Sequence, residues 1–227
     1  YYFKKNLIRT NPPRPVDVPK IKNKNIIRLD PNEIAQLLDE AESGEKLSGR
    51  QLASHEKTKV RDVAILTLLL GTGIRVSECV GLNLEDVDFN NGAIRIIRKG
   101  GNEALIYFGD EVSQALEAYM NGSRKTAEPA AGHEEALFIS LNKTRITTRS
   151  VERLVKKYSR LVTTVKKITP HKLRSTFGTA LYQETGDIYL VADTLGHKDV
   201  NTTKKHYAAI DEHRRRMAAN VVKLRES

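Results

Sequence analysis

The sequence predicts a mainly α-helical fold with one small antiparallel β-sheet, an α+β domain. Two observations predict it. From residue 30 onward most segments place apolar residues three and four positions apart, which is the spacing of amphipathic helices, and glycine or proline separates the segments. Residues 87–108 instead contain three short apolar runs divided by an Asn-Gly turn and a Gly-Gly turn, which is typical of strands in a small meander.

Residues 1–28 differ from the rest of the chain in composition. They contain Pro12, Pro13, Pro15 and Pro19, followed by several lysines. Prolines oppose helix formation and neighbouring lysines repel one another, so this stretch is expected to be an extended basic linker. Residues 1–8 have the pattern of the last turns of a helix from a preceding domain. We therefore expect one folded domain over residues 29–227.

The helices of this domain are expected in a definite order. Asp30 is placed to cap the first, because Pro31 suits the first helical position and Glu33 completes a capping box. A polar loop over residues 44–55 precedes the most apolar helix, 57–70, which is the best candidate for the core. The remaining helices are expected over residues 76–82, 111–120, 148–162, 170–185, 188–195 and 211–224. The helix over 148–162 places five basic side chains on its outer face: Arg149, Arg153, Lys156, Lys157 and Arg160.

Charge and cysteine content restrict the class of function. The chain carries 38 lysines and arginines against 28 aspartates and glutamates, a formal charge of +10. This excess favours a polyanionic partner, nucleic acid before an anionic membrane. No run of 18 apolar residues is present, so no membrane span is expected. Cys79 is the single cysteine, which excludes a disulfide framework and predicts a buried thiol in a reducing compartment.

Residues 169–207 hold the strongest candidates for chemistry. His171 and Arg174 stand three residues apart, so a helix projects both from one face. An arginine matches a phosphate with two parallel N–H groups, and a neighbouring imidazole exchanges protons near neutral pH. His197 follows a glycine, and the hydroxyl of Tyr207 could attack phosphorus. Taken singly, each histidine is more often an exposed or capping residue, and such a tyrosine more often packs in a core.

A second group of residues, closer to the N-terminus, favours the functional interpretation of these side chains over the structural one. Together with the first group it makes five separated motifs that resemble the tyrosine recombinase (phage integrase) family, over about residues 30–209. The motifs are Thr72-Gly73-Ile74-Arg75-Val76-Ser77-Glu78, Arg98-Lys99-Gly100, His171-Lys172-Leu173-Arg174, Leu195-Gly196-His197 and Tyr207. The resemblance implies that residues 29–227, with the C-terminal helix, are a catalytic domain. Residues 1–28 would then be a linker and the end of an N-terminal DNA-binding domain.

The resemblance also implies roles for the basic residues. Attack on a DNA phosphodiester builds negative charge on its two non-bridging oxygens, which preorganised cations stabilise. Arg75 and Arg174 would form that clamp. Glu78 would pair with Arg75 and hold its guanidinium in place, although a purely structural salt bridge is nearly as good an interpretation.

The other candidates would handle protons and the covalent bond. Lys99, on a glycine-flanked turn, would be the general acid for the leaving 5′-oxygen. His171 would exchange a proton with Tyr207 or bind the phosphate, and His197 would donate to a non-bridging oxygen. Tyr207 would be the nucleophile that becomes joined to the 3′-phosphate. No metal, ATP or other cofactor is implied, and the sequence has no phosphate-binding glycine loop, zinc helix or carboxylate cluster for two metals.

The function expected from this resemblance is site-specific DNA recombination by an integrase of a phage or mobile element. A type IB topoisomerase shares the same chemistry and is the alternative enzyme. A DNA-binding protein with vestigial catalytic residues is the alternative outside the enzymes. The expected partners are double-stranded DNA, three further copies in a tetramer that exchanges C-terminal helices, and an accessory DNA-bending or directionality factor. The expected location is the bacterial cytoplasm, at the nucleoid.

Overall fold

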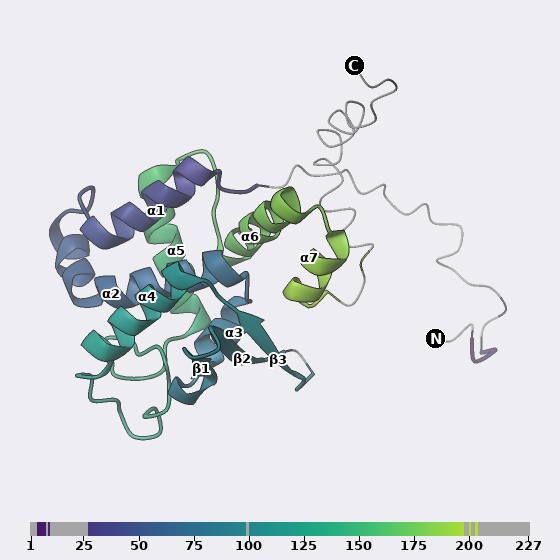
Figure 1. Cartoon of the computed structure of the whole chain (residues 1–227), viewed down its shortest axis with the longest axis horizontal. Helices are drawn as coiled ribbons and strands as arrows, with labels where there is room; N and C mark the ends of the chain where they lie inside the picture. The colour runs from purple at the N-terminus through teal and green to yellow at the C-terminus, as the bar shows by residue number, and fades with distance from the viewer. Residues whose placement is uncertain are drawn as a thin grey trace, which may run out of the picture.

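The computed structural model describes residues 4–7, 9, 27–98, 100–197, 200 and 203, and it is mostly helical with one three-stranded antiparallel sheet (Figure 1). This confirms the predicted fold class. Of the helix end predicted over residues 1–8, residues 4–7 are described and form a turn and a bend, not a helix. The helix predicted over 211–224 lies outside the described residues. No helix in the described ranges is long and apolar enough to cross a membrane.

The first helix begins as its sequence predicts. In α1 (Pro31–Ser43) the carboxylate of Asp30 accepts the backbone N–H of Glu33 at 3.0 Å, and the carboxylate of Glu33 accepts that of Asp30 at 2.9 Å. This reciprocal capping box satisfies two of the amide groups that a helix start leaves unpaired.

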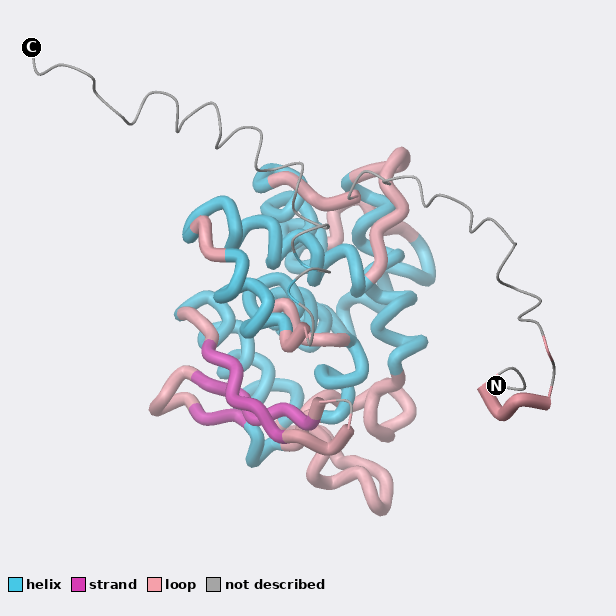
Figure 2. The backbone as a smooth tube through the Cα atoms, turned by 90° about the vertical axis from the view of Figure 1, so that its right-hand side faces the viewer, coloured by secondary structure: helices cyan, strands magenta, loops and turns pink. Residues whose placement is uncertain are grey.

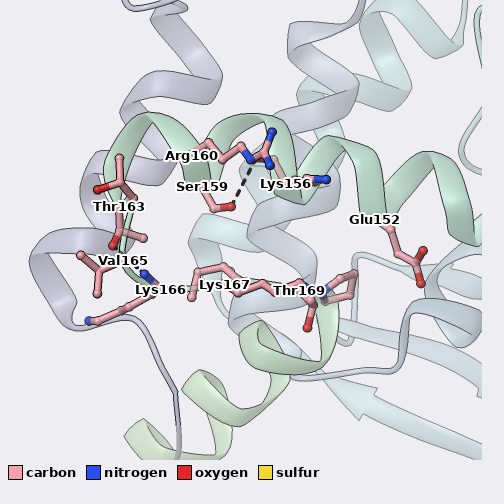
Figure 3. A pocket seen from close by; sticks show the side chains of 12 residues that line it. Glu152, Lys156, Ser159, Arg160, Thr163, Val165, Lys166, Lys167 and Thr169 are labelled. Atoms are coloured by element: carbon pink, nitrogen blue, oxygen red, sulfur yellow. Dashed lines mark hydrogen bonds between the residues drawn. The ribbon is translucent and has the colours of Figure 1, made fainter.

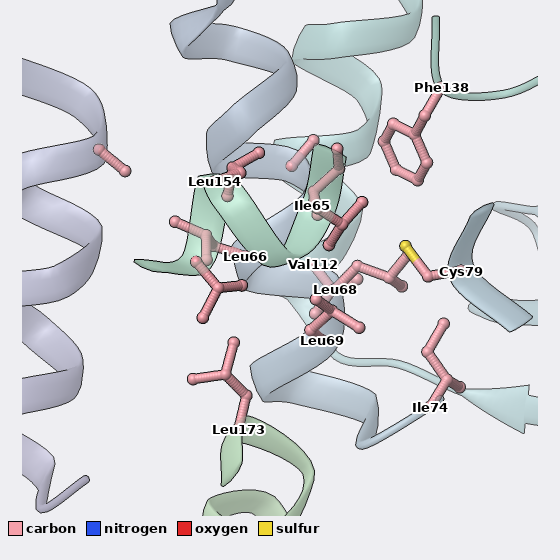
Figure 4. Close-up of a cluster of buried hydrophobic side chains, with 14 of the residues drawn as sticks. Ile65, Leu66, Leu68, Leu69, Ile74, Cys79, Val112, Phe138, Leu154 and Leu173 are labelled. Carbon is pink, nitrogen blue, oxygen red and sulfur yellow. The ribbon is translucent and has the colours of Figure 1, made fainter. Parts of the chain in front are cut away.

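The second helix is the centre of the molecule. Helix α2 (Gly49–Thr72) buries Ile65, Leu66, Leu68 and Leu69 completely, and α1, α4, α5 and α6 pack around it. Figure 4 shows these side chains meeting Phe138 and other apolar groups from the surrounding elements. The predicted core helix is therefore confirmed.

The predicted loop over residues 44–55 is wrong in its second half, because α2 begins at Gly49. The reason is His55, whose side chain is fully buried with Nδ1 3.0 Å from the hydroxyl oxygen of Tyr158. His55 and Tyr158 are 103 residues apart in the sequence, so the local polar composition could not reveal their contact. The core helix therefore begins about two turns earlier than predicted.

A buried polar cluster joins α2 to α5. Asp62 accepts hydrogen bonds from Arg61, Thr58 and Tyr158, at 2.7 to 3.1 Å. Lys157 donates to the Tyr158 hydroxyl at 2.8 Å and lies 3.9 Å from the Asp62 carboxylate. Lys157 was expected on the outer face of its helix, and this is a correction: the buried carboxylate of Asp62 draws its ammonium group inward.

The three strands form a meander at one end of the helical body, drawn in magenta in Figure 2. Their pairing places Val87 opposite Ile94 and Arg95 opposite Leu105, with Ile94 and Ile106 turned into the core. All three strands lie within residues 87–108, where the sequence predicts the meander. The strands are β1 (Val87–Asp88), β2 (Ala93–Ile97) and β3 (Glu103–Tyr107), preceded by α3 (Val76–Gly81) and the 3₁₀ turn η1 (Leu84–Asp86).

The remaining helices follow the predicted bounds closely: α4 (Asp110–Tyr119) with the π-helical turn η2 (Met120–Arg124), α5 (Thr148–Val162), α6 (Pro170–Thr185) and α7 (Ile188–Leu195). Helices α6 and α7 pack on each other through a second, smaller apolar cluster that includes Tyr182, Val191 and Leu195. Figure 1 shows this pair beside the main body, on the side toward which the β2–β3 hairpin extends.

Candidate active site

Arg174 joins the ends of two helices. Its guanidinium is 6% exposed and donates from Nη1 to the carbonyl of Gly73 at 2.6 Å and from Nη2 to the carbonyl of Leu195. Gly73 caps the C-terminus of α2 with φ of +64°, and a Cβ there would collide with the ring of Phe177. Glycine is therefore required for this close approach of α6 to the end of α2.

Arg75 and Glu78 form the ion pair that the sequence suggested. Arg75 caps α3: its backbone N–H and its Nη1 donate to the two oxygens of the Glu78 carboxylate, at 2.7 and 2.8 Å. The Glu78 side chain is 3% exposed and the Arg75 side chain 36% exposed. The second guanidinium nitrogen, Nη2, donates to the carbonyl of Gly196 at 3.3 Å. Glu78 thus holds one edge of a guanidinium whose other edge reaches the end of α7.

The two histidines lie on either side of Arg174 in the sequence, and both follow Arg75. His171 is the second residue of α6, is exposed, and stands one turn before Arg174. His197 directly follows the C-cap Gly196 of α7, and its backbone N–H donates to the carbonyl of Ala192 at 2.8 Å. Its Nδ1 lies 2.7 Å from the hydroxyl of the buried Thr203, which fixes the orientation of the ring.

The structure therefore brings together three of the predicted catalytic residues and the supporting Glu78. Arg174 and Arg75 bind the carbonyls of Leu195 and Gly196, and His197 is the next residue along the chain. Lys99 and Tyr207 lie outside the described residues.

The described residues of the β2–β3 turn are hydrogen-bonded to one another. The Arg98 N–H donates to the Asn102 carbonyl at 2.8 Å, and the Gly101 N–H donates to the Arg98 carbonyl at 3.0 Å.

Arg98 also belongs to this region, although the sequence indicated no role for it beyond its place in the Arg98-Lys99-Gly100 motif. Its Nη1 donates to the carbonyl of Asp193 at 3.5 Å and its Nη2 to that of Thr194 at 3.2 Å. Nothing in the local sequence distinguishes it from the other exposed cations near a turn. The one signal was its position beside Lys99.

A basic groove leads away from the start of α6. A cavity of about 550 Å³ lies between α5 and residues 163–170. Its cationic side chains come from Lys156, Arg160, Lys166 and Lys167, and Figure 3 shows them around the opening. Lys166 is paired with Glu33 at 2.5 Å. Among the described residues no carboxylate lies within 4.0 Å of the charged groups of Lys156, Arg160 and Lys167.

Two further observations limit the chemistry of this site. Burial raises the pKa of the Cys79 thiol to about 12, so this cysteine stays protonated and inert at neutral pH, as its sequence context predicted. Within the described ranges no group of three or more histidine, cysteine, aspartate or glutamate side chains is arranged to hold a metal ion.

Comparison with known proteins places these observations in a family. The model of the phage integrase family matches residues 27–214. The chain belongs to the phage integrase family.

Curated members of the family share clear sequence identity with this chain. The tyrosine recombinase XerC of Thermodesulfovibrio yellowstonii is 35% identical over 206 residues, which are 90% of this chain and 65% of the relative. The XerC of Syntrophus aciditrophicus is 35% identical over 211 residues, 92% of this chain and 64% of the relative. The chain thus spans just under two thirds of the length of these two relatives.

Solved structures of family members share its fold. The XerA recombinase superposes with a TM-score of 0.71 at 27% identity, over 88% of this chain and 67% of that one. The integrase of transposon Tn1549, solved in complex with circular intermediate DNA, superposes with a TM-score of 0.69 at 26% identity, over 95% of this chain and 73% of that one. These likenesses confirm the predicted family and its α+β catalytic-domain fold.

Proposed function

We propose that this chain carries the catalytic machinery of a site-specific DNA recombinase, which cuts and rejoins double-stranded DNA through a covalent bond between Tyr207 and a 3′-phosphate. One observation carries the proposal beyond family membership. Arg75, Arg174 and His197, which are far apart in the sequence, meet at the C-terminal end of α7. Such convergence of two guanidinium groups and an imidazole is what phosphoryl transfer can use to stabilise developing negative charge.

The two arginines suit the non-bridging oxygens of a phosphodiester. Each already has part of its guanidinium fixed by protein oxygens, Arg75 by Glu78 and Gly196, and Arg174 by Gly73 and Leu195. A donor fixed before the substrate arrives does not have to be reorganised as charge develops in the transition state. Arg75 and Arg174 are proposed as the clamp, with Glu78 as the residue that positions Arg75.

The remaining roles follow from the chemistry of the reaction. The Tyr207 oxygen forms a bond to phosphorus, and the bond from phosphorus to the 5′-oxygen of deoxyribose breaks. The tyrosine proton passes to His171, Lys99 supplies a proton to the departing 5′-oxygen, and His197 donates to a non-bridging oxygen. Because protein cations supply the charge, the proposal needs no metal or ATP, and cleavage should continue at full rate in EDTA.

Double-stranded DNA is the proposed partner. The formal charge of +10 and the groove lined by Lys156, Arg160 and Lys167 support it, because Pro170, the residue before His171, also lines the groove. The Tn1549 integrase was solved bound to DNA. A duplex bound at Arg75 and Arg174 would extend its phosphate backbone toward Lys156, Arg160 and Lys167.

The assembly and its setting are proposed on the family resemblance. Four copies would join two DNA sites, with the helix expected over residues 211–224 packing on a neighbouring copy. An accessory DNA-bending or directionality protein would set the direction of the reaction. The element that carries the protein would be a phage or another mobile element.

Substitution of Tyr207 tests the proposed function. Target duplexes are first selected from a randomised pool by covalent retention on the wild-type protein and are then nicked near the cleavage site so that the adduct accumulates. Tyr207→Phe should form no covalent adduct while its DNA affinity stays within about twofold of wild type. Tyr189→Phe is the matched control, because Tyr189 is exposed on α7, and it should form the adduct normally.

Two results would contradict the proposal. An undiminished adduct in Tyr207→Phe would remove this tyrosine from the reaction. Relaxation of any supercoiled plasmid, with no preference for the selected duplex, would instead indicate a type IB topoisomerase.

A further inference from the structure

The end of α7 is held by three arginines. Four consecutive carbonyls, those of residues 193 to 196, each accept a hydrogen bond from a guanidinium. Arg174 and Arg75 hold the last two, and Arg98 holds the first two. The C-terminus of a helix carries a partial negative charge and carbonyls that lack helical partners, so cations are stabilised there.

The Arg98 guanidinium packs tightly against the end of α7. Its Nη1 occupies the position that a Cβ of residue 196 would take, and Gly196 has a φ of +61°. Its Nε is buried and has no hydrogen-bond partner among the described residues. Leaving a buried N–H unpaired costs free energy, so the two carbonyl contacts and the packing on Gly196 must outweigh that cost.

Arg98 also connects two parts of the proposed active site. It directly follows β2 and directly precedes Lys99, while the carbonyls that it binds lie three and four residues before His197. The hairpin touches the end of α7 through this side chain. The position of one proposed catalytic group is therefore tied to the position of another.

We propose that Arg98 is a positioning residue for strand cleavage: by binding the end of α7 it fixes the base of the β2–β3 hairpin relative to His197 and so sets where Lys99 meets the departing 5′-oxygen. The inference rests on the proposed function. The proposal gives Arg98 no contact with the reacting atoms: it acts through the position of Lys99. A lysine cannot replace it fully, since a single ammonium group lacks the planar fork that spans two neighbouring carbonyls.

The leaving group provides a specific test. A deoxyribose 5′-oxygen needs a proton as its bond to phosphorus breaks, whereas a 5′-sulfur in the same position leaves as a thiolate without one, because thiols are far more acidic than alcohols. A defect in delivering the proton should therefore disappear on a duplex with a 5′-bridging sulfur. A defect in the arginine clamp should remain on both duplexes.

The experiment compares cleavage rates of the full chain on the selected duplex with a 5′-oxygen or a 5′-sulfur at the cut site. Arg98→Ala should slow cleavage of the oxygen duplex by about 10- to 100-fold, the scale expected when a general acid is misplaced by about 1 Å. On the sulfur duplex Arg98→Ala should cleave within about threefold of the wild-type rate. On the oxygen duplex the rate of Arg98→Lys should lie between those of wild type and Arg98→Ala. Lys99→Ala should also regain its rate on the sulfur duplex, whereas Arg174→Ala should be slow on both duplexes.

Arg95→Ala is the matched control. Arg95 lies on β2, three residues before Arg98, and pairs with Glu85 and Asp86. Its loss should leave the cleavage rates on the oxygen and sulfur duplexes unchanged. Hydrogen exchange without DNA gives an independent measurement: Arg98→Ala should raise the exchange of residues 98–103 and 193–197 together and leave α1–α5 unaffected.

Several outcomes would overturn the inference. Wild-type rates or faster cleavage in Arg98→Ala would show that the contact does not help the reaction, and equal slowing on both duplexes would show a general structural defect. Unchanged exchange at residues 193–197 would show that the guanidinium does not hold the helix end. Absence of any adduct with the wild-type protein would instead overturn the proposed function, and the role of Arg98 in cleavage with it.

Discussion

Two regions of the molecule hold buried charge in opposite ways. In the body formed by α1–α5, Asp62 faces Arg61 and Lys157 inside a large apolar core, so opposite charges pair within the protein. At the end of α7 the apolar cluster is small, and Arg174 and Arg98 bind backbone carbonyls. Arg75 divides its guanidinium between the carboxylate of Glu78 and the carbonyl of Gly196.

The difference indicates what each region is for. The carboxylate of Asp62 offsets the cations beside it, whereas a carbonyl offers only a partial charge and leaves a guanidinium attractive to an anion. The body should therefore control stability, and the end of α7 should control binding and cleavage of phosphate. The two regions can be separated by mutation.

The largest effect on stability is expected at Asp62. Asp62→Ala leaves Arg61 and Lys157 without their buried counter-charge and should lower the free energy of unfolding by about 3–5 kcal/mol, the usual range for breaking a buried pair. Chemical denaturation measures it. Glu56→Ala, which breaks the exposed pair with Lys59, is the control and should cost less than about 1 kcal/mol. Equal losses would remove the distinction between the two kinds of pair.

Arg174→Ala should affect the reaction more than the fold. Loss of a fixed donor to the phosphate oxygens should raise the barrier to cleavage by about 3 kcal/mol, a loss of at least 100-fold in rate. Unfolding should become easier by only about 1–3 kcal/mol, because two buried carbonyls lose a partner. Single-turnover cleavage and denaturation on the same preparation measure both. Arg153→Ala, an exposed arginine on α5, should change neither.

A smaller effect is expected in the basic groove. Arg160→Gln should reduce the slope of log affinity against log salt by about 0.9, the value for one phosphate contact. Fluorescence anisotropy over a salt series measures it. Lys143→Gln removes a lysine that is already paired with Glu128 in a loop, and it should leave the slope unchanged. An unchanged slope for Arg160→Gln would place the DNA backbone elsewhere.

The smallest effect is a pH dependence of stability from His55. Burial lowers the pKa of His55 below its ordinary 6.5, and the charge of Lys157 adds to this, against the opposing charges of Asp62 and Glu56. Below pH 6.5 the unfolded chain thus binds more protons at this position than the folded chain, so stability present above that pH is lost as the pH falls. The melting temperature between pH 7.5 and 5 should fall less in His55→Gln than in wild type. His133→Gln should match wild type.

Local patterns in the sequence were sufficient for most of the fold. The capping box at Asp30 and the apolar periodicity of residues 57–70 and 170–185 correspond to real helices, because caps and amphipathic faces are local features. The start of α2 and the inward turn of Lys157 could not be predicted in this way. The start of α2 depends on the contact of His55 with Tyr158, and the inward turn of Lys157 depends on Asp62; the two residues of each pair are close only in space.

The candidate site likewise contains contacts that are local in the sequence and contacts that are not. The spacing of His171 and Arg174 predicts a shared helix face, and Glu78 was recognised as a partner for Arg75 because they stand three residues apart. The contacts of Arg98 with α7 span 95 and 96 residues and have no local signature. The roles of Lys99 and Tyr207 remain predictions from the resemblance.

Mass spectrometry of the trapped complex tests the central claim most directly. After nuclease digestion and trypsin, the peptide from residue 206 to 214 contains a single tyrosine, Tyr207. We predict that this peptide gains the mass of a nucleotide linked through its 3′-phosphate. A nucleotide linked to any other residue, or none in a complex that cleaves DNA, would contradict the account.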